Sequence, residues 1–141
     1  MAKRTANATW RGGLKTGNGT FRVPRGNIEG PYTFASRFEE GSGLSPEDLI
    51  AAAHAACYSM AFSADLEKAG FVPTSVETSA TVNMEPVDGA PTINRIELET
   101  VGAVPGIDEA TFQKIADGAR RNCPISRLLN AEITVSAKLQ G

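Results

Sequence analysis

Two cysteines are the residues best suited to chemistry in this chain of 141 residues. Cys57 stands in the alanine-rich run HAACYSMAF, and Cys123 precedes a proline in RRNCPISRLL. Two cysteines are too few for the disulfide scaffold of a small secreted protein, and in a reducing compartment a disulfide is more often catalytic than structural. The pair is therefore either two buried core thiols or a redox couple.

The surroundings of the two thiols differ. Pro124 prevents a helix from continuing through Cys123, and the segment PISRLL can restart as a short helix with Cys123 at its N-cap. Free backbone N–H groups at such a helix start favour a thiolate. Cys57 lies far from the ends of its predicted helix, so a thiolate there needs a nearby cation. The sequence alone does not choose one among 14 lysines and arginines.

His54, the only histidine, lies three residues before Cys57 and near the same helix face. It is either an amphipathic side chain at a helix edge or the base of a hydrolytic Cys–His pair, which would also need an orienting residue and an oxyanion hole. A metal site from His54, Cys57 and Cys123 lacks the close paired spacing of zinc ligands, so we expect no metal. Taken alone, Glu47 is a first-turn carboxylate that favours the helix dipole, and Arg37 is a solvated strand residue.

The helix that carries Cys57 has clear boundaries in the sequence. Ser45 is a plausible N-cap, Pro46 fits the first turn, and Gly70 can end the helix, which predicts a helix from about 46 to 69. Its many alanines give a thin profile that lets another backbone approach closely. We therefore expect this helix to be central rather than a surface cover.

Strand patterns surround this helix. The segments ATWRGGL and GTFRV flank the turn KTGNG, and YTFASRF reads as a third strand. After the helix, SVETSATVNME alternates and turns at VDGAP into TINRIELETVGAV, a second helix follows the capping Asp108, and AEITVSAKL closes the chain. This order predicts an α+β fold, with an antiparallel sheet of about six strands and two main helices, as a single domain over residues 1–141.

Composition excludes several classes of protein. Hydrophobic residues make up 41% and charged residues 21%, and the net charge of −2 offers no broad basic surface for nucleic acid. No stretch approaches the roughly 18 apolar residues of a membrane span, and the start of the chain has no apolar signal core. We expect a cytoplasmic protein with neither a nucleic-acid nor a membrane partner.

Taken together, these motifs resemble the OsmC branch of the OsmC/Ohr family of thiol-dependent organic hydroperoxide reductases. The resemblance spans nearly the whole chain and is carried by ATWRGGLKTGNGT, YTFASRFE, SPEDLIAAAHAACYSMAF, AVPGIDEATF and NCPISRLLNAEIT. One departure is GLSPEDL, where family members commonly read GTNPEEL or GTNPEQL. Ser45 can cap a helix as asparagine does, so the helix start should be little affected.

The resemblance implies roles for four residues. Cys57 would be the peroxidatic thiol and Cys123 the resolving thiol, with Arg37 and Glu47 as a supporting charged pair. The Ohr branch takes its arginine from the N-terminal hairpin, whereas Arg37 in ASRFE lies where the OsmC branch has it, which makes Arg22 and Arg25 weaker candidates.

The resemblance also implies an OsmC-like fold as an intertwined homodimer with two sites at its interface. The substrates would be organic hydroperoxides. No bound cofactor is implied, because an external dithiol, such as a dihydrolipoyl group on a lipoyl protein, would return the enzyme to its reduced form.

Helix geometry adds a prediction about how the site is assembled. In one straight helix Glu47 and Cys57 are separated by about 15 Å along the axis and face about 80° apart, so they cannot touch. We therefore predict that each site combines Cys57 and Cys123 of one chain with Glu47, and with Arg37, of the other.

We further expect Phe38, Met60 and Phe62 to line an apolar substrate site.

Two other functions remain open at this point. A dimer of the same fold could bind a small apolar ligand with idle cysteines, which would leave Arg37 and Glu47 without a task. A hydrolase using Cys57 and His54 is the weaker alternative.

Overall fold

A computed structural model of the chain describes residues 2–141. Its strands are β1 (Asn7–Arg11), β2 (Asn18–Val23), β3 (Ile28–Tyr32), β4 (Ser75–Val87), β5 (Ala90–Ala103) and β6 (Glu132–Leu139). Its helices are the 3-10 turn η1 (Pro24–Gly26), α1 (Phe34–Phe38), α2 (Pro46–Lys68), α3 (Glu109–Asn122) and α4 (Pro124–Leu128). Contacts between residues divide the chain into two compact units, Met1–Leu49 and Ile50–Gly141. This division does not test the prediction that the chain is a single domain.

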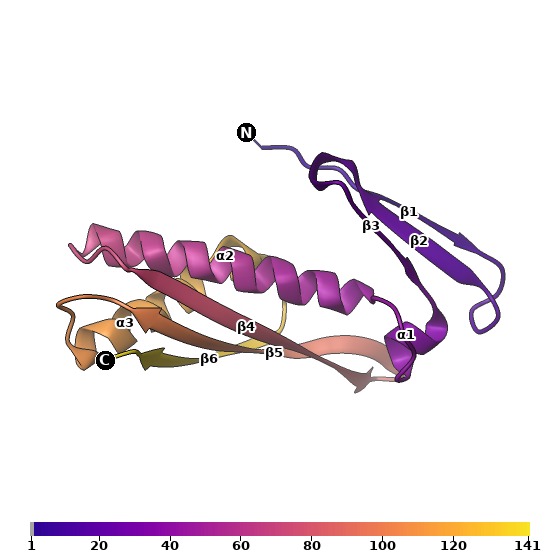
Figure 1. Cartoon of the computed structure of the whole chain (residues 1–141). Coiled ribbons are helices and arrows are strands. Elements are labelled where there is room, and N and C mark those ends of the chain that lie inside the picture. Colours follow the sequence, from indigo (N-terminus) through magenta and orange to yellow (C-terminus); the bar gives the residue numbers. More distant parts are fainter. Residues whose placement is uncertain (1) are drawn as a thin grey trace. The chain divides into compact units, whose positions relative to one another are not determined.

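The first unit is built on an antiparallel sheet of three strands in the order β1-β2-β3, as the N-terminal turn motif predicts (Figure 1). Gly19 in the central strand pairs with Trp10 on one side and Tyr32 on the other. The two aromatic rings lie over this glycine, 5.4 Å apart, and a Cβ on Gly19 would come within 2.7 Å of both. The glycine therefore allows the aromatic pair to close over the sheet.

The third strand lies earlier in the chain than predicted: of the segment YTFASRF only Tyr32 is in β3, and FASRF is helical. β3 ends at Tyr32 and is followed by α1. Thr33 caps this helix: its Oγ1 accepts from the backbone N–H of Ser36 at 3.1 Å, and the Ser36 hydroxyl accepts from the N–H of Thr33 at 2.8 Å. This reciprocal capping box satisfies two backbone donors locally. Arg37 consequently lies on a helix and not on a strand.

α2 confirms the prediction for the central segment. Ser45 and Asp48 form the cap, since Ser45 Oγ accepts from the N–H of Asp48 at 3.2 Å while Asp48 Oδ2 accepts from the N–H of Ser45 at 2.8 Å. At the other end Gly70 adopts a φ of +94°, and the N–H of Phe71 bonds the carbonyl of Leu66 at 2.9 Å. That bond is the C-terminal closure that glycine permits.

The second unit contains a sheet in the order β4-β5-β6. β4 and β5 form a long hairpin around Asp88 and Gly89, which both have positive φ, as a two-residue turn requires. β6 pairs parallel with β5, which corrects the expectation of a wholly antiparallel sheet. The chain crosses from β5 to β6 through α3 and α4, and such a crossover returns a strand in the same direction. The six strands thus form two sheets of three.

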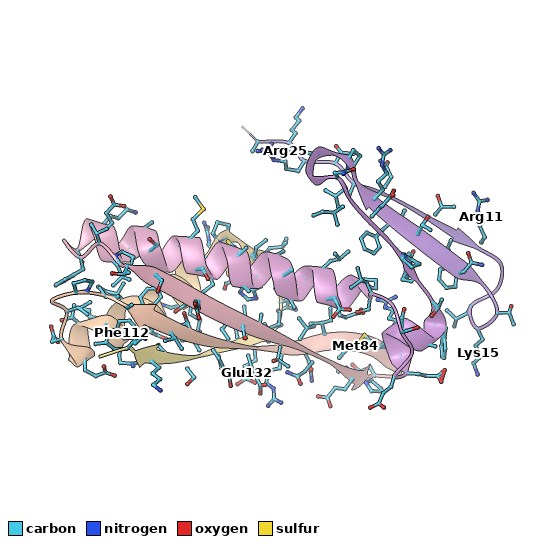
Figure 2. The ribbon with its side chains drawn as sticks, viewed as in Figure 1. Arg11, Lys15, Arg25, Met84, Phe112 and Glu132 are labelled. Carbon is cyan, nitrogen blue, oxygen red and sulfur yellow. The ribbon has the colours of Figure 1, made fainter. Side chains whose placement is uncertain are left out.

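The core of the second unit lies between this sheet and the helices α2 and α3. Its fully buried side chains include Tyr58 and Phe62 from α2 and Ile96 and Leu98 from β5. Phe112, labelled on α3 in Figure 2, is also fully buried, and its ring leaves no room for a Cβ on Gly102 of β5. These contacts hold α2 firmly along one face of the sheet.

α2 also has the length and composition of a membrane-spanning helix. The mean hydropathy of an 18-residue window reaches 1.2, contrary to the expectation that no stretch approaches a span, and 22% of that window is buried. A core helix of a soluble protein passes the same test, and Tyr58, Phe62 and Leu66 of α2 are core residues. The exposed residues of α2 include the apolar Ala52, Ala53, Ala56, Met60 and Ala64 along its middle, with Asp48, Glu67 and Lys68 near its ends.

Candidate functional site

The two thiols lie against each other in the second unit. Cys57 on α2 and Cys123 at the N-cap of α4 are free, and a hydrogen bond joins their Sγ atoms at 3.0 Å. Cys123 is fully buried and Cys57 is partly exposed. A disulfide bond is only about 1 Å shorter than this separation. The arrangement can therefore form a disulfide with a small movement.

Local backbone conformation places Cys123 there. Its φ of −54° and ψ of 126° leave the helical region between α3 and α4, as the proline at 124 predicts. Its N–H still bonds the carbonyl of Ala119 at 2.9 Å, so the residue ends one helix and begins the next. The predicted N-cap position is confirmed, and the thiol bonds Cys57 rather than the backbone of α4.

Burial, Cys123 and the backbone of Ile125 all affect the protonation of Cys57. Burial raises the pKa of this thiol most, the hydrogen bond with Cys123 raises it further, and a hydrogen bond from the backbone of Ile125 lowers it. Within the second unit none of these effects comes from a cation. The second unit by itself therefore favours the neutral thiol at Cys57, and a reactive thiolate needs a positive charge from elsewhere.

His54 is fully buried, so its expected place at a helix edge is wrong. Its Nε2 lies 2.8 Å from the hydroxyl of Ser126 on α4, and burial lowers the pKa of the imidazole. The ring is thus engaged with Ser126, and no hydrogen bond joins it to Cys57 among residues 2–141, so the pair that a Cys–His hydrolase would use is not formed in this structure. Ser126 is a residue that the sequence analysis did not find.

Arg37 and Glu47 form an ion pair in the first unit. Nε and Nη2 of Arg37 lie 3.0 Å and 2.9 Å from Oε1 of Glu47, and the guanidinium carbon lies 5.2 Å from the centre of the Phe38 ring. The arginine side chain is 39% exposed while that of Glu47 is 12% exposed. The carboxylate therefore anchors a guanidinium that still presents donors to a ligand. These are the two residues that the family resemblance implies as a charged pair.

A recess of about 240 Å³ adjoins this ion pair within the first unit, lined by Trp10, Leu14, Tyr32, Thr33, Phe34, Arg37 and Phe38. It combines one cation with an aromatic wall. Of the expected lining residues, Phe38 is present, Phe62 is fully buried in the core of the second unit, and Met60 is 78% exposed on α2. A larger recess, of about 620 Å³, is lined by Arg25 but contains none of the four candidate residues.

Residues 2–141 contain no group of three or more histidine, cysteine and acidic side chains placed to hold a metal ion. The chemistry of the described residues is that of the thiol pair and the ion pair.

Solved structures identify the fold. The chain resembles an OsmC-like protein from Mycoplasma pneumoniae with a TM-score of 0.75 at 17% identity, covering 99% of both chains. It also resembles the organic hydroperoxide resistance protein OhrB of Bacillus subtilis, with a TM-score of 0.68 at 23% identity over 96% of this chain and 98% of the other. The architecture is therefore that of the OsmC-like proteins.

Sequence comparison defines the family. The OsmC-like protein family matches residues 39–138. The chain is 46% identical over 138 residues to Peroxiredoxin OsmC of Escherichia coli, covering 97% of this chain and 96% of that protein. It is 34% identical over 100 residues to the organic hydroperoxide resistance protein of Xanthomonas axonopodis, covering 70% and 68% of the two. This chain belongs to the OsmC-like family, as its sequence motifs indicate.

Proposed function

We propose that this protein is a thiol peroxidase that reduces organic hydroperoxides to alcohols through Cys57 and Cys123. The observation that carries the proposal is the 3.0 Å separation of the two sulfur atoms across α2 and α4. The names of the relatives, a peroxiredoxin in Escherichia coli and an organic hydroperoxide resistance protein in Xanthomonas axonopodis, support it. A cytoplasmic role in defence against oxidative or osmotic stress fits a thiol that must be kept reduced.

The reaction balances with these two residues and one external reductant. The Cys57 thiolate attacks the hydroperoxide ROOH, the O–O bond breaks, and the alkoxide takes up a proton to leave as ROH. Cys57 is then a sulfenic acid. The sulfur of Cys123 displaces its hydroxyl, which leaves as water, and a disulfide forms. A dithiol, such as a dihydrolipoyl group, reduces that disulfide and itself becomes a cyclic disulfide.

Arg37 supplies the positive charge next to Cys57 that the second unit does not provide. Burial and Cys123 raise the pKa of Cys57, so the thiolate needs a cation to be populated near neutral pH. Arg37 is oriented by Glu47 and remains partly exposed, which suits it to bind both a thiolate and a peroxide oxygen. This role places Arg37 and Glu47 in the catalytic site.

We further propose an intertwined homodimer in which Arg37 and Glu47 act on the thiols of the partner chain. α2 is unbroken from Pro46 to Lys68, so Glu47 and Cys57 are separated by about 15 Å along its axis and face about 80° apart. A carboxylate cannot span that separation. The low burial of the apolar helix α2, on which Met60 is 78% exposed, and a buried Glu47 Oε2 without a hydrogen-bond partner among residues 2–141 both favour a second copy of the chain.

Mixed dimers test this assembly. A Cys57→Ser chain combined with a Glu47→Ala chain places both changes in one site and leaves the other intact, so the purified heterodimer should show about half the wild-type activity. Each homodimer of a single variant serves as the control. Heterodimer activity no higher than that of the parents would show that the four residues act within one chain.

A substrate panel tests the function itself. Hydrogen peroxide, small alkyl hydroperoxides, cumene hydroperoxide and fatty-acid hydroperoxides would each be offered with a dithiol donor, and kcat/KM compared. The aromatic recess beside Arg37 favours organic peroxides, because an apolar group gains roughly 25 cal/mol per Å² on burial and hydrogen peroxide has none to bury. Equal efficiency on all substrates contradicts the substrate class. No turnover at all favours the alternative, a dimer that only binds a small apolar ligand.

A further inference from the structure

A second link joins the elements that carry the two thiols. His54 lies one helical turn before Cys57 on α2, and Ser126 lies one turn after Cys123 on α4, with 2.8 Å between His54 Nε2 and Ser126 Oγ. The sulfur pair and this imidazole–hydroxyl pair therefore bridge the same two helices side by side. His54 is fully buried and Ser126 is 8% exposed, so water does not compete for the hydrogen bond between them.

The chemistry of the imidazole restricts its role. Nδ1 of His54 is buried and has no hydrogen-bond partner among residues 2–141. A buried N–H without an acceptor is rarer and more costly than a bare acceptor, so the proton belongs on Nε2, where it is donated to Ser126. Burial also lowers the pKa of His54, which agrees with a neutral ring. The imidazole thus acts as a fixed donor and not as a proton carrier.

The position of α4 matters to both steps at Cys57. The backbone of Ile125, next to Ser126, hydrogen-bonds Cys57 in the sense that lowers its pKa, and Cys123 at the start of α4 supplies the second sulfur. α4 is only five residues long, so few side chains are available to keep it in register on α2. A side-chain hydrogen bond in a water-free contact can fix that register.

We propose that His54 and Ser126 are positioning residues that hold α4 so that Cys123 can attack an oxidised Cys57. This inference rests on the proposed function. In the step that it controls, the Cys123 sulfur displaces hydroxide from the Cys57 sulfenic acid, one S–S bond forms, one S–O bond breaks, and water leaves. Without the link, α4 samples other positions, the sulfenic acid lives longer, and excess peroxide converts it to sulfinic acid.

Stopped-flow oxidation separates the two steps. Ser126→Ala and His54→Leu should each slow disulfide formation about fivefold to tenfold, which is the worth of one hydrogen bond, and should increase trapping of the sulfenic acid. The double variant should be no slower than either single variant, because both remove the same bond. His54→Gln, whose amide nitrogen reaches the place of Nε2, should restore most of the rate.

Ser59→Ala is the matched control, since Ser59 also lies on α2 and its hydroxyl bonds Thr78 at 2.7 Å, away from α4. It should form the disulfide at the wild-type rate. The positioning role would be overturned if Ser126→Ala slowed disulfide formation only as much as Ser59→Ala does, or only in proportion to its loss of thermal stability. Wild-type rates of disulfide formation in both Ser126→Ala and His54→Leu would also overturn it.

An equilibrium measurement keeps this test independent of the peroxidase proposal. In glutathione redox buffers, Ser126→Ala should lower the equilibrium constant for forming the Cys57–Cys123 disulfide about fivefold, while Ser59→Ala leaves it unchanged. If wild-type protein forms the disulfide in these buffers but not with peroxides, the proposed function fails, while a lower equilibrium constant in Ser126→Ala still supports the positioning role. Equal equilibrium constants for disulfide formation in Ser126→Ala and wild type would reject the positioning role and leave the proposed function standing.

Discussion

The two units of the chain differ in how much of their apolar surface is buried within the unit. In the second unit the thiols lie in contact, backed by a core that includes Tyr58, Phe62 and Phe112. In the first unit Phe21 is the only hydrophobic side chain among its described residues that is buried, while Leu14 is 64% exposed. A three-stranded sheet with so little covered surface depends on further packing for its stability.

This difference indicates that the two units have different roles in the proposed reaction. The second unit can bring two sulfurs together without help, but it raises the pKa of Cys57 and so suppresses the thiolate. The first unit holds an oriented guanidinium beside an aromatic recess, yet it contains no thiol. Under the proposed function the second unit carries out the redox steps, and the first unit supplies charge and substrate selectivity.

The largest effect is expected from the thiols of the second unit. Cys57→Ser should abolish peroxide consumption, because the nucleophile is lost. Cys123→Ser should still consume about one peroxide per chain, leaving a sulfenic acid on Cys57 that excess peroxide over-oxidises. Stoichiometric titration with mass spectrometry checks both. A fast first turnover in Cys57→Ser would exchange the roles of the two cysteines.

A smaller loss of activity is expected when Arg37 of the first unit is replaced. Arg37→Ala should reduce kcat/KM about 10²-fold to 10³-fold, the usual cost of removing one charge-stabilising donor. It should also move the midpoint of the pH profile for the first turnover above about 8.5, the value for an ordinary thiol, because burial and Cys123 then outweigh the backbone hydrogen bond of Ile125 and raise the pKa of Cys57.

Arg25→Ala is the control for this prediction, because Arg25 lines a different recess of the first unit. It should keep the wild-type rate and pH profile. A large loss in Arg25→Ala with none in Arg37→Ala would move the catalytic arginine to the hairpin position of the Ohr branch.

The aromatic recess should produce a selective effect of about tenfold. Leu14→Ser removes apolar surface from its wall, so kcat/KM for cumene hydroperoxide should fall by about that factor, while the value for hydrogen peroxide stays unchanged. Ile28→Ser, also an exposed residue of the first unit but outside the recess, is the control. Equal losses on both peroxides would show that the recess does not bind the organic group.

Features set by neighbouring residues could be predicted from the sequence. The Ser45 cap, the end of α2 at Gly70 and the N-cap position of Cys123 each depend on a few adjacent residues. The prediction for YTFASRF was wrong because the mutual bonds of Thr33 and Ser36 outweigh its strand-like aromatic residues.

Long-range relations were harder to predict. The link between His54 and Ser126 joins residues 72 positions apart, and a lone serine gives no signal of such a partner. Phe62 looked like a substrate contact because periodicity places it on a helix face without telling which face meets the core. The parallel pairing of β6 likewise depends on a crossover and not on the alternation within the strand.

The smallest effect concerns stability. Burial lowers the pKa of His54, so the unfolded chain takes up a proton at a higher pH than the folded chain does. Stability is therefore complete above the unfolded value of about 6.5 and is lost as the pH falls below it, by at most about 1.4 kcal/mol per pH unit. His54→Gln cannot titrate, so its melting temperature should fall by a few °C less than that of wild type between pH 7.5 and pH 5.5. Because His54 is the only histidine, the difference between the two proteins reports this one group. An equal decline in both would mean that the buried imidazole is as easily protonated as one in water, and would contradict the neutral, donating ring that the link to Ser126 requires.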